Sequence, residues 1–296
     1  MPSLPYISTP CDWLCRKEVF FMPYGKIIAI ANQKGGVGKT TTSVNLSAGL
    51  SLRKKKVLLI DLDPQGDSAK ALGYTEPNKM KDTISNIMLE MIVSDECDIE
   101  NRIIHTEEGF DLIPANEKLS NIEKTLENIE DKETVLKDVL KPIKDKYDFI
   151  IIDCRPSLGM LTINAFTCAD SVIIPTQPEY LSATGTQQLL SRIQKTKNDQ
   201  NPQLEVEGIL ITMTDERTLL GKEINRQIHE NYGKHFHVFT NKIPRRVSIA
   251  ESSAVGKSIF KYDSKSDGAN AYHVLAREVD LNAKREVKRH RDSITR

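Results

Sequence analysis

A glycine-rich segment between a predicted strand and a predicted helix constrains this chain more than any other feature of its sequence. Residues 34–41 read Lys-Gly-Gly-Val-Gly-Lys-Thr-Thr; they follow an apolar run at 26–31 and precede a helical pattern at 40–52. Glycines let the backbone curl until successive N–H groups point at one anion, and the start of a helix adds partial positive charge. The strand–loop–helix context therefore predicts a phosphate-binding loop, in which Lys39 reaches the β- and γ-phosphates and Thr40 ligates Mg²⁺.

Apolar runs typical of buried parallel strands alternate with amphipathic segments along the rest of the chain. Apolar residues recur at helical spacing through 119–129 and 135–143, as expected of helices that cover a sheet. The predicted strands are 26–31, 56–61, 110–114, 147–153, 171–175, 208–212 and 236–243. This alternation predicts an α/β fold, a mainly parallel twisted sheet flanked by helices on both faces, with ligands at the carboxyl ends of the strands.

Composition limits the kinds of protein that the chain can be. Basic and acidic residues balance at 41 each, so any binding of nucleic acid must use a local patch or pair two patches in a dimer. No run approaches the roughly 20 apolar residues that span a bilayer. The five cysteines are scattered and odd in number, which indicates a reduced, cytosolic protein rather than a disulfide framework.

The chain divides into one predicted domain with an extension at each end. Residues 1–25 lack hydrophobic periodicity and are interpreted as a translated leader or a disordered arm. Met22 is a candidate native start, because the codons for residues 16–19 can contain a ribosome-binding sequence. Residues 26–280 form the predicted nucleotide-binding domain, and residues 281–296 a basic tail.

The phosphate loop departs from the common G-x-x-x-x-G-K-[ST] pattern at its start. Gln33 takes the place of the first glycine, and an additional lysine, Lys34, begins the motif. This form resembles the deviant Walker A family, which includes ParA/Soj, MinD and the nitrogenase iron protein. The resemblance implies that Lys34 reaches across a dimer interface to the partner's nucleotide, where it stabilises developing phosphate charge as an arginine finger does elsewhere.

Further segments narrow the resemblance to ParA/Soj partition ATPases, over residues 26 to about 279. Residues 61–66 (Asp-Leu-Asp-Pro-Gln-Gly), 175–181 and 243–251 are similar to segments of that group. By resemblance, Asp63 lies near the γ-phosphate and positions the attacking water. Asp153 ends an apolar strand, where a Walker B carboxylate holds Mg²⁺.

The resemblance implies a full set of site residues, written here as expectations. The catalytic residues are Lys34, Lys39 and Asp63, and the Mg²⁺ site comprises Thr40, Asp63 and Asp153. ATP is expected to contact Lys34, Gly35, Gly36, Val37, Gly38, Lys39, Thr40 and Thr41, with adenine against the main chain near Met213 and Pro244.

The DNA-contacting residues are expected to be Arg217, Arg245, Arg246 and Lys257. Arg217 matches the arginine of the group's D-x-R-T segment, whereas Ser248 stands where the group has a second DNA-binding arginine; Arg246 is hypothesised to compensate. A third departure is Arg155, two residues after Asp153, where the group has a small residue or proline; its sequence position is close to the nucleotide.

The function that the resemblance implies is ATP-dependent DNA segregation. A cytoplasmic, nucleoid-associated ATPase would hydrolyse Mg·ATP and form an ATP-sandwich homodimer on non-specific duplex DNA, from which a ParB-like centromere-binding partner releases it. The segment before the loop is too short for a helix-turn-helix with its supporting helices, so operator binding is not expected.

Two rival interpretations belong to other classes of protein. A MinD-like membrane-positioning ATPase needs a C-terminal amphipathic helix, but the tail offers only Leu281, Val287 and Ile294 among basic residues. An iron–sulfur reductase needs paired cysteines at a dimer interface, and Cys97 and Cys168 lack the necessary motifs.

Overall fold

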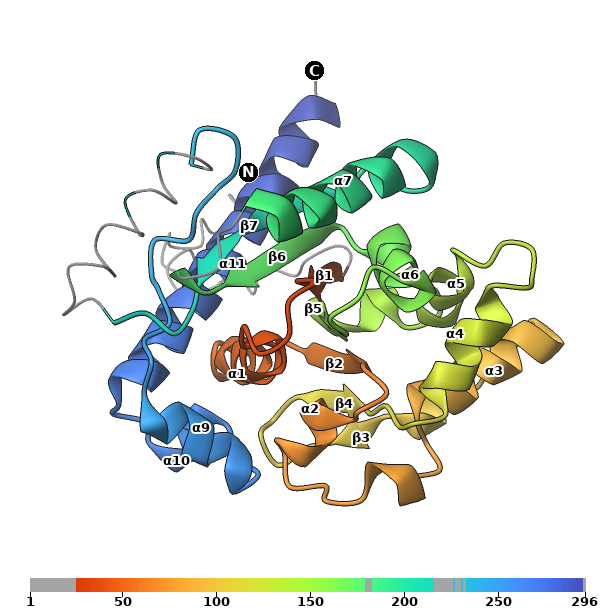
Figure 1. Cartoon of the computed structure of the whole chain (residues 1–296), viewed down its shortest axis with the longest axis horizontal. Coiled ribbons are helices and arrows are strands. Elements are labelled where there is room, and N and C mark those ends of the chain that lie inside the picture. Colours follow the sequence, from red (N-terminus) through yellow and green to blue (C-terminus); the bar gives the residue numbers. More distant parts are fainter. Residues whose placement is uncertain (1–24, 179–182, 216–225, 227–229, 231–232, 295–296) are drawn as a thin grey trace, which may run out of the picture.

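A seven-stranded sheet organises the chain (Figure 1), with the strand order β3-β4-β2-β5-β1-β6-β7. The computed structural model describes residues 25–178, 183–215, 226, 230 and 233–294. All neighbouring strands pair in parallel except β3 and β4, which are antiparallel. The strands are β1 Lys26–Ile30, β2 Val57–Leu62, β3 Ile104–His105, β4 Asp111–Ile113, β5 Phe149–Cys154, β6 Ser171–Thr176 and β7 Glu205–Ile211.

Helices cover both faces of the sheet, as the alternating pattern predicts. The α-helices are α1 Lys39–Leu52, α2 Asp67–Lys70, α3 Ile84–Ser94, α4 Leu119–Leu126, α5 Val135–Leu140, α6 Met160–Cys168, α7 Ala183–Asp199, α9 Val247–Ala254, α10 Ile259–Tyr262 and α11 Asp267–Ile294. Three short 3₁₀ helices are η1 Pro77–Lys79, η2 Glu100–Arg102 and η3 Lys144–Lys146.

Two hydrophobic cores lie on opposite faces of the sheet because successive strand residues point to opposite sides. Ile27 and Ala29 of β1 pack with helices α3 to α7, whereas Ile28 and Ile30 pack with α1, α10 and α11. After Lys26 the strand is therefore apolar at every position from Ile27 to Ile30, which is the expected consequence of burial on both faces. This arrangement puts the end of β1 and the loop after it at the centre of the carboxyl edge.

The predicted strand at 236–243 is wrong. This segment runs beside β7 without a continuous ladder: Val238 forms an isolated bridge with Ile209, and the Ile243 N–H donates to the Ile211 carbonyl at 2.9 Å. Between these contacts the chain bends toward α11, where the Asn241 side-chain amide donates to the Ala271 carbonyl at 3.0 Å. The buried apolar residues create a strand-like pattern, but the pairing with β7 is interrupted where Thr240 and Asn241 bond to α11.

The short strand β3 was not anticipated from the sequence. It has two residues and pairs along the edge strand β4. Helix α11 continues through the predicted boundary between residues 280 and 281, and Ala283 and Val287 are buried in the core. The first part of the basic tail is thus one face of a packed helix; the predicted leader, residues 1–24, lies outside the described residues.

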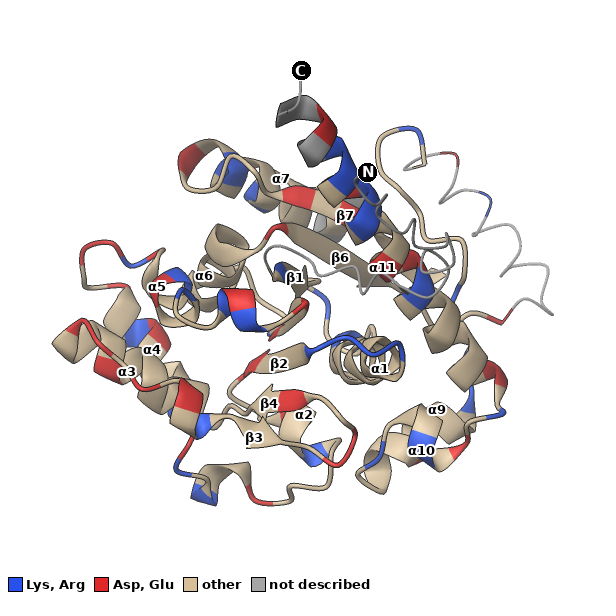
Figure 2. Ribbon diagram, turned by 180° about the vertical axis from the view of Figure 1, so that it is seen from behind, with Lys and Arg blue, Asp and Glu red and all other residues tan. Residues whose placement is uncertain are grey.

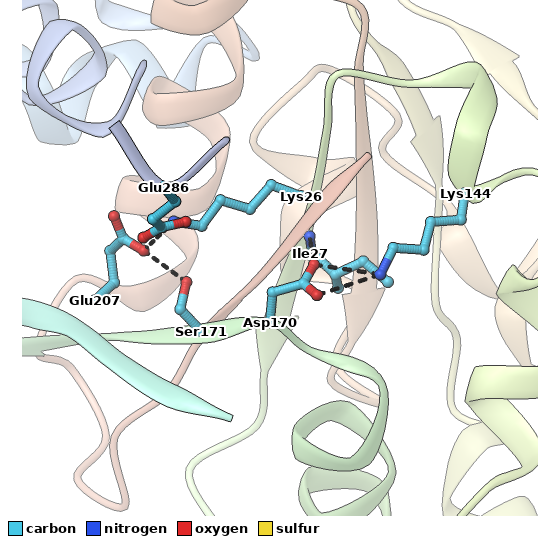
Figure 3. A network of polar contacts seen from close by, with 7 residues as sticks. All are labelled: Lys26, Ile27, Lys144, Asp170, Ser171, Glu207 and Glu286. Carbon is cyan, nitrogen blue, oxygen red and sulfur yellow. Dashed lines mark hydrogen bonds and ion pairs between the residues drawn. The ribbon is translucent and has the colours of Figure 1, made fainter. Parts of the chain in front are cut away.

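A buried ion-pair network joins β1, β7 and α11 at the amino edge of the sheet (Figure 3). The Lys26 ammonium donates to Glu207 Oε2 at 2.6 Å and to Glu286 Oε2 at 2.8 Å, and the Ser171 hydroxyl also donates to Glu207 at 2.7 Å. Burial alone would lower the pKa of Lys26, but the two carboxylates more than offset it, so the pKa is raised. The network fixes the start of the strand that leads into the phosphate loop.

Candidate functional site

The phosphate loop is a curled main chain between β1 and α1. Gly36 and Gly38 have φ values of 73° and 84°, in the left-handed region that favours glycine. A Cβ atom placed on Gly35 or Gly36 would meet no heavy atom within 4 Å, and one on Gly38 would meet only the Met213 methyl at 3.8 Å. The space over the loop is therefore open, and an anion can approach the backbone closely.

Lys39 begins α1 and folds back over the loop. Its ammonium donates to the Lys34 carbonyl at 2.9 Å, and the residue is 7% exposed. Burial lowers the pKa of Lys39, although the carboxylates of Asp153 and Asp63 oppose the shift. Lys39, Asp63 and Asp153, three of the predicted site residues, thus lie close together in the structure.

Asp153 lies at the end of β5 in a ring of hydroxyl groups. The Ser43 and Ser68 hydroxyls donate to its two oxygens at 3.0 and 2.9 Å, and the Thr40 hydroxyl lies close enough to lower the pKa of this carboxylate. Burial raises the pKa of Asp153 to about 6, against the effect of these hydrogen bonds. A buried carboxylate beside a threonine hydroxyl is a donor set that fits Mg²⁺, a cation that prefers oxygen ligands.

Asp61 and Asp63 lie on the neighbouring strand β2 and the turn after it. Asp61 is opposite Asp153 in the register of the two strands, and its oxygens accept the backbone N–H groups of Asp63 and Ser68 at 2.9 and 3.1 Å. Burial and the nearby Asp153 raise the pKa of Asp61 well above its ordinary value. Asp61 therefore shapes the turn, whereas the half-buried Asp63 side chain accepts the Gln65 N–H, at 3.0 Å.

Three polar side chains tie the loop to the ends of the neighbouring strands β6 and β7, and none of them was predicted as a site residue. Asn32 donates to the Pro175 carbonyl at 2.7 Å, Gln177 to the Gly36 carbonyl at 2.7 Å and Thr212 to the Val37 carbonyl at 2.9 Å. Gln177 lies within the segment 175–181 that resembles the partition ATPases, so that segment carried a signal. Ser43 and Ser68 are ordinary small polar residues in sequence, and their role depends on tertiary contact.

Met213 and Pro244, the predicted adenine neighbours, lie close together beside the loop. Met213 has φ 53° and accepts the Gln177 amide at its sulfur. Thr214 pairs with Pro244, and a hollow of about 390 Å³ opens next to them. Its lining comprises Thr214, Asp215, Thr240, Asn241, Lys242, Pro244, Arg246, Asp267, Asn270 and Ala271.

The predicted DNA-contacting residues have different surroundings. Arg245 and Lys257 are exposed, whereas Arg246 forms an ion pair with Asp267 at 2.9 Å. Arg217 lies outside the described residues. Lys and Arg residues also mark α10 and the C-terminal half of α11 in Figure 2. Arg246 is thus already partly neutralised by its own chain.

The structure buries several of the side chains that a membrane-positioning ATPase or an iron–sulfur reductase would need on its surface. Of the three apolar residues in the tail, Val287 is buried in the core, Leu281 is exposed, and the Ile294 side chain lies outside the description. In the described part of the chain, no helix is both long and apolar enough to cross a membrane. Burial raises the pKa of the Cys168 thiol to about 12 and that of Cys154 well above its ordinary value, so both behave as core residues.

Replacing Asp153 by asparagine is expected to stabilise the protein in the absence of bound nucleotide and metal. Because the pKa in the fold, about 6, exceeds the ordinary 3.8, the stabilising contribution of Asp153 is present at acid pH and is lost as pH rises through about 4 to 6. Above that window the neutral amide avoids the cost, by on the order of 1 kcal/mol after the hydroxyls reorient. Urea unfolding at pH 4 and pH 8 measures this: a gain at pH 8 that shrinks at pH 4 is expected, and a loss at pH 8 contradicts it.

Comparison with known proteins identifies the family. A family model described as an AAA domain matches residues 25–206. The sporulation initiation inhibitor protein Soj of Bacillus subtilis is 45% identical over 260 residues, covering 87% of this chain and 99% of that protein. The chromosome partitioning protein ParA of Myxococcus xanthus is 41% identical over 265 residues, covering 89% and 91%.

Solved structures agree with the sequence relatives. A plasmid partition protein from Borrelia burgdorferi B31 bound to AMPPNP has a TM-score of 0.71 at 27% identity, covering 87% of this chain and 99% of that one. The cobyrinic acid a,c-diamide synthase of Mycobacterium smegmatis, bound to an ATP analog and magnesium, has a TM-score of 0.73 at 34% identity, covering 85% and 93%. With its phosphate loop, parallel sheet and these relatives, the chain belongs to the ParA/Soj family of partitioning proteins, P-loop NTPases with a deviant Walker A loop.

Proposed function

We propose that this protein is a Mg·ATP-driven DNA-partition ATPase. The observation that carries the proposal is the open glycine loop, with Lys39 and Lys34 beside it and the buried Asp153 carboxylate at its base. Transfer of a phosphoryl group to water needs little covalent help from a protein, so catalysis depends on positioning and on neutralising charge. The loop N–H groups and Lys39 would supply that neutralisation around the β- and γ-phosphates.

Thr40 and Asp153 are the residues that would hold Mg²⁺. The Thr40 hydroxyl lies close enough to Asp153 to lower its pKa, and the Ser43 and Ser68 hydroxyls donate to the Asp153 carboxylate and orient it. When bound, the metal neutralises charge that develops on the phosphate oxygens. Asp63 lies in the turn after β2, the strand adjacent to β5, and is close enough to Lys39 to influence the pKa of that lysine. We assign Asp63 to orienting the attacking water, with a contribution to the metal site.

An ATP-sandwich homodimer would complete the site. Lys34 belongs to the rim of the loop, where its charge would reach the partner's nucleotide in a face-to-face dimer. The adenine would lie near Met213 and Pro244, beside the hollow described above. Dimerisation would also pair the two sets of basic residues, so that affinity for DNA follows the nucleotide state.

The proposed partners are non-specific duplex DNA and a ParB-like centromere-binding protein, and the proposed location is the cytoplasm, on the nucleoid. The exposed Arg245 and Lys257 support a phosphate-contacting patch at α9 and α10, with Arg217 and Arg246 as its further members. Contacts of this kind read charge rather than sequence. The partner would act by stimulating hydrolysis and thereby releasing the dimer.

Retention of sequence-unrelated duplex DNA is expected only with Mg·ATP, and not with Mg·ADP or without nucleotide. Because binding would be driven by counterion release, it should weaken steeply between 50 and 200 mM salt, on the order of a thousandfold for six or more phosphate contacts. Filter or column retention across a salt series measures both effects.

Variants sharpen this test. Arg245→Ala should weaken retention, while Lys70→Ala, which removes an exposed lysine paired with Asp67 on α2, should not. Arg246→Ala tests the compensation hypothesis, because Asp267 already competes for its guanidinium. Equal retention in all three nucleotide states would contradict the DNA-partition function while leaving ATP hydrolysis to be judged separately.

A further inference from the structure

The loop after β5 is tied to the rest of the domain by an ion pair that the nucleotide site itself does not require. Arg155, two residues beyond Asp153, donates through its guanidinium to Glu123 of α4. The side chains are 29% and 16% exposed, so the pair is shielded from solvent rather than displayed on the surface. Arg155 therefore directs its charge at a carboxylate of its own chain.

Glu123 makes a second contact with the same loop. Its carboxylate lies directly against Gly159, the residue that caps the start of α6, so closely that a Cβ atom at position 159 would collide with it. A carboxylate at this place also faces the partial positive charge of the α6 N-terminus. Glu123 thus joins the beginning of the loop, through Arg155, to its end at Gly159.

The loop between these points is short and otherwise held by few bonds. Within it, the Ser157 N–H donates to the Arg155 carbonyl at 2.9 Å, and Thr162 of α6 donates to the Ser157 carbonyl at 2.7 Å. The Ser157 hydroxyl is buried and finds no partner among the described residues. The ion pair is therefore one of the main interactions that hold the segment following Asp153 in place.

We propose that Glu123 and Arg155 are positioning residues for ATP hydrolysis: their ion pair fixes the loop from Cys154 to Gly159 against α4 and α6 and so keeps Asp153 aligned beneath the phosphate loop. The inference rests on the proposed ATPase function. Displacements of about 1 Å in catalytic groups can cost up to a hundredfold in rate. Since Asp153 retains its bonds to Ser43 and Ser68, a smaller loss, about threefold to tenfold, is expected when the pair is broken.

The test measures kcat and KM for ATP, together with the affinity of the nucleotide alone, for Arg155→Met, Glu123→Gln and the double variant. Each single change should lower kcat about threefold to tenfold while nucleotide affinity stays within about twofold. The double variant should be no slower than the slower single variant, because the two residues act through one contact. Arg155→Lys keeps the cation and should recover most of the rate.

A matched control is available on the same side of the sheet. Arg102 pairs with Glu90 of α3 at 2.6 Å and is 21% exposed, similar to Arg155, but it does not touch the loop after β5. Arg102→Met should leave kcat unchanged. The melting temperature of every variant, measured in parallel, separates loss of fold from loss of rate.

The outcomes discriminate between the explanations. A fall in melting temperature with unchanged kcat would overturn the inference and make the pair merely structural. Independent, multiplicative losses in the double variant would overturn it too, as would a loss confined to nucleotide affinity. If the wild-type protein hydrolyses no ATP, the proposed function fails, and this inference with it; wild-type hydrolysis with unaffected variants contradicts the inference alone.

Discussion

Replacing Lys39 by methionine is expected to lower the rate of ATP hydrolysis by at least about a hundredfold, the usual consequence of removing one preorganised donor to transition-state charge. Lys39 is the buried cation of the phosphate loop, and its ammonium lies near both Asp63 and Asp153. Methionine keeps the length of the side chain but offers no charge to phosphate oxygens. Nucleotide affinity should fall as well, because the ground state also uses this contact.

The same variant should fold normally, which separates its catalytic effect from instability. The pKa of Lys39 is lowered mainly by burial, so at neutral pH the fold holds this charge at a cost in free energy. Removing a charge that the fold disfavours does not destabilise the nucleotide-free protein. Its melting temperature should therefore equal or exceed that of the wild type.

Steady-state phosphate release and fluorescent-nucleotide binding measure the prediction, with Lys70→Met as the control for loss of an exposed lysine. Lys34→Met provides a further comparison. If Lys34 acts across the dimer interface, this variant should bind nucleotide normally as a monomer but fail to hydrolyse it or to dimerise with ATP. Undiminished hydrolysis by Lys39→Met would contradict the assigned phosphate site.

The second large effect is expected at the opposite edge of the sheet, where Lys26→Met should destabilise the protein by about 3 to 5 kcal/mol. The Lys26 ammonium neutralises the Glu207 carboxylate, whose side chain is only 3% exposed, and also contacts Glu286 (Figure 3). One Glu207 oxygen, Oε1, already has no hydrogen-bond partner among the described residues. Without Lys26, a buried charge would remain with the Ser171 hydroxyl as its one donor among the residues that the structure describes.

Two companion variants isolate the cause. Glu286→Gln should cost much less than Lys26→Met, because Glu286 is half exposed and the Lys26–Glu207 contact survives. The double variant Lys26→Met/Glu207→Gln should recover much of the lost stability, since it removes both buried charges together. Urea unfolding at pH 7 measures all three. A cost for the double variant no smaller than that of Lys26→Met would show that loss of packing, rather than a stranded charge, is responsible.

The parts of the fold that the sequence predicted were those governed by local pattern. Residues 27–31 have the all-apolar character of a strand buried on two faces, and most of this run became β1. The motif at 34–41 placed the start of α1 to within one residue, because glycine geometry and a helix N-terminus are local properties. The strand predicted at 236–243 did not form because a long-range contact overrides the local pattern. Its apolar residues are buried, but Asn241 bonds to α11 rather than to a strand.

In the candidate site, too, the residues defined by local sequence pattern were predictable and those defined by tertiary contact were not. Lys39, Thr40 and Asp153 were identifiable because each stands at a fixed place relative to a strand end, and the structure brings them together. Ser43 and Ser68, which orient Asp153, carry no signal in sequence, because a hydroxyl becomes informative only when folding brings a carboxylate to it. Gln177 and Thr212, which hold the loop from the neighbouring strands, are of the same kind.

The sequence by itself determined the phosphate loop, the parallel α/β architecture and the family, since these depend on residue order, periodicity and short-range backbone geometry. Only the tertiary structure decided which charges are neutralised within the chain. Arg155, close to the nucleotide in sequence, is turned to Glu123, and Arg246 is held by Asp267. Electrostatic pairing depends on distance in space and on burial, and neither is encoded in the spacing of residues along the chain.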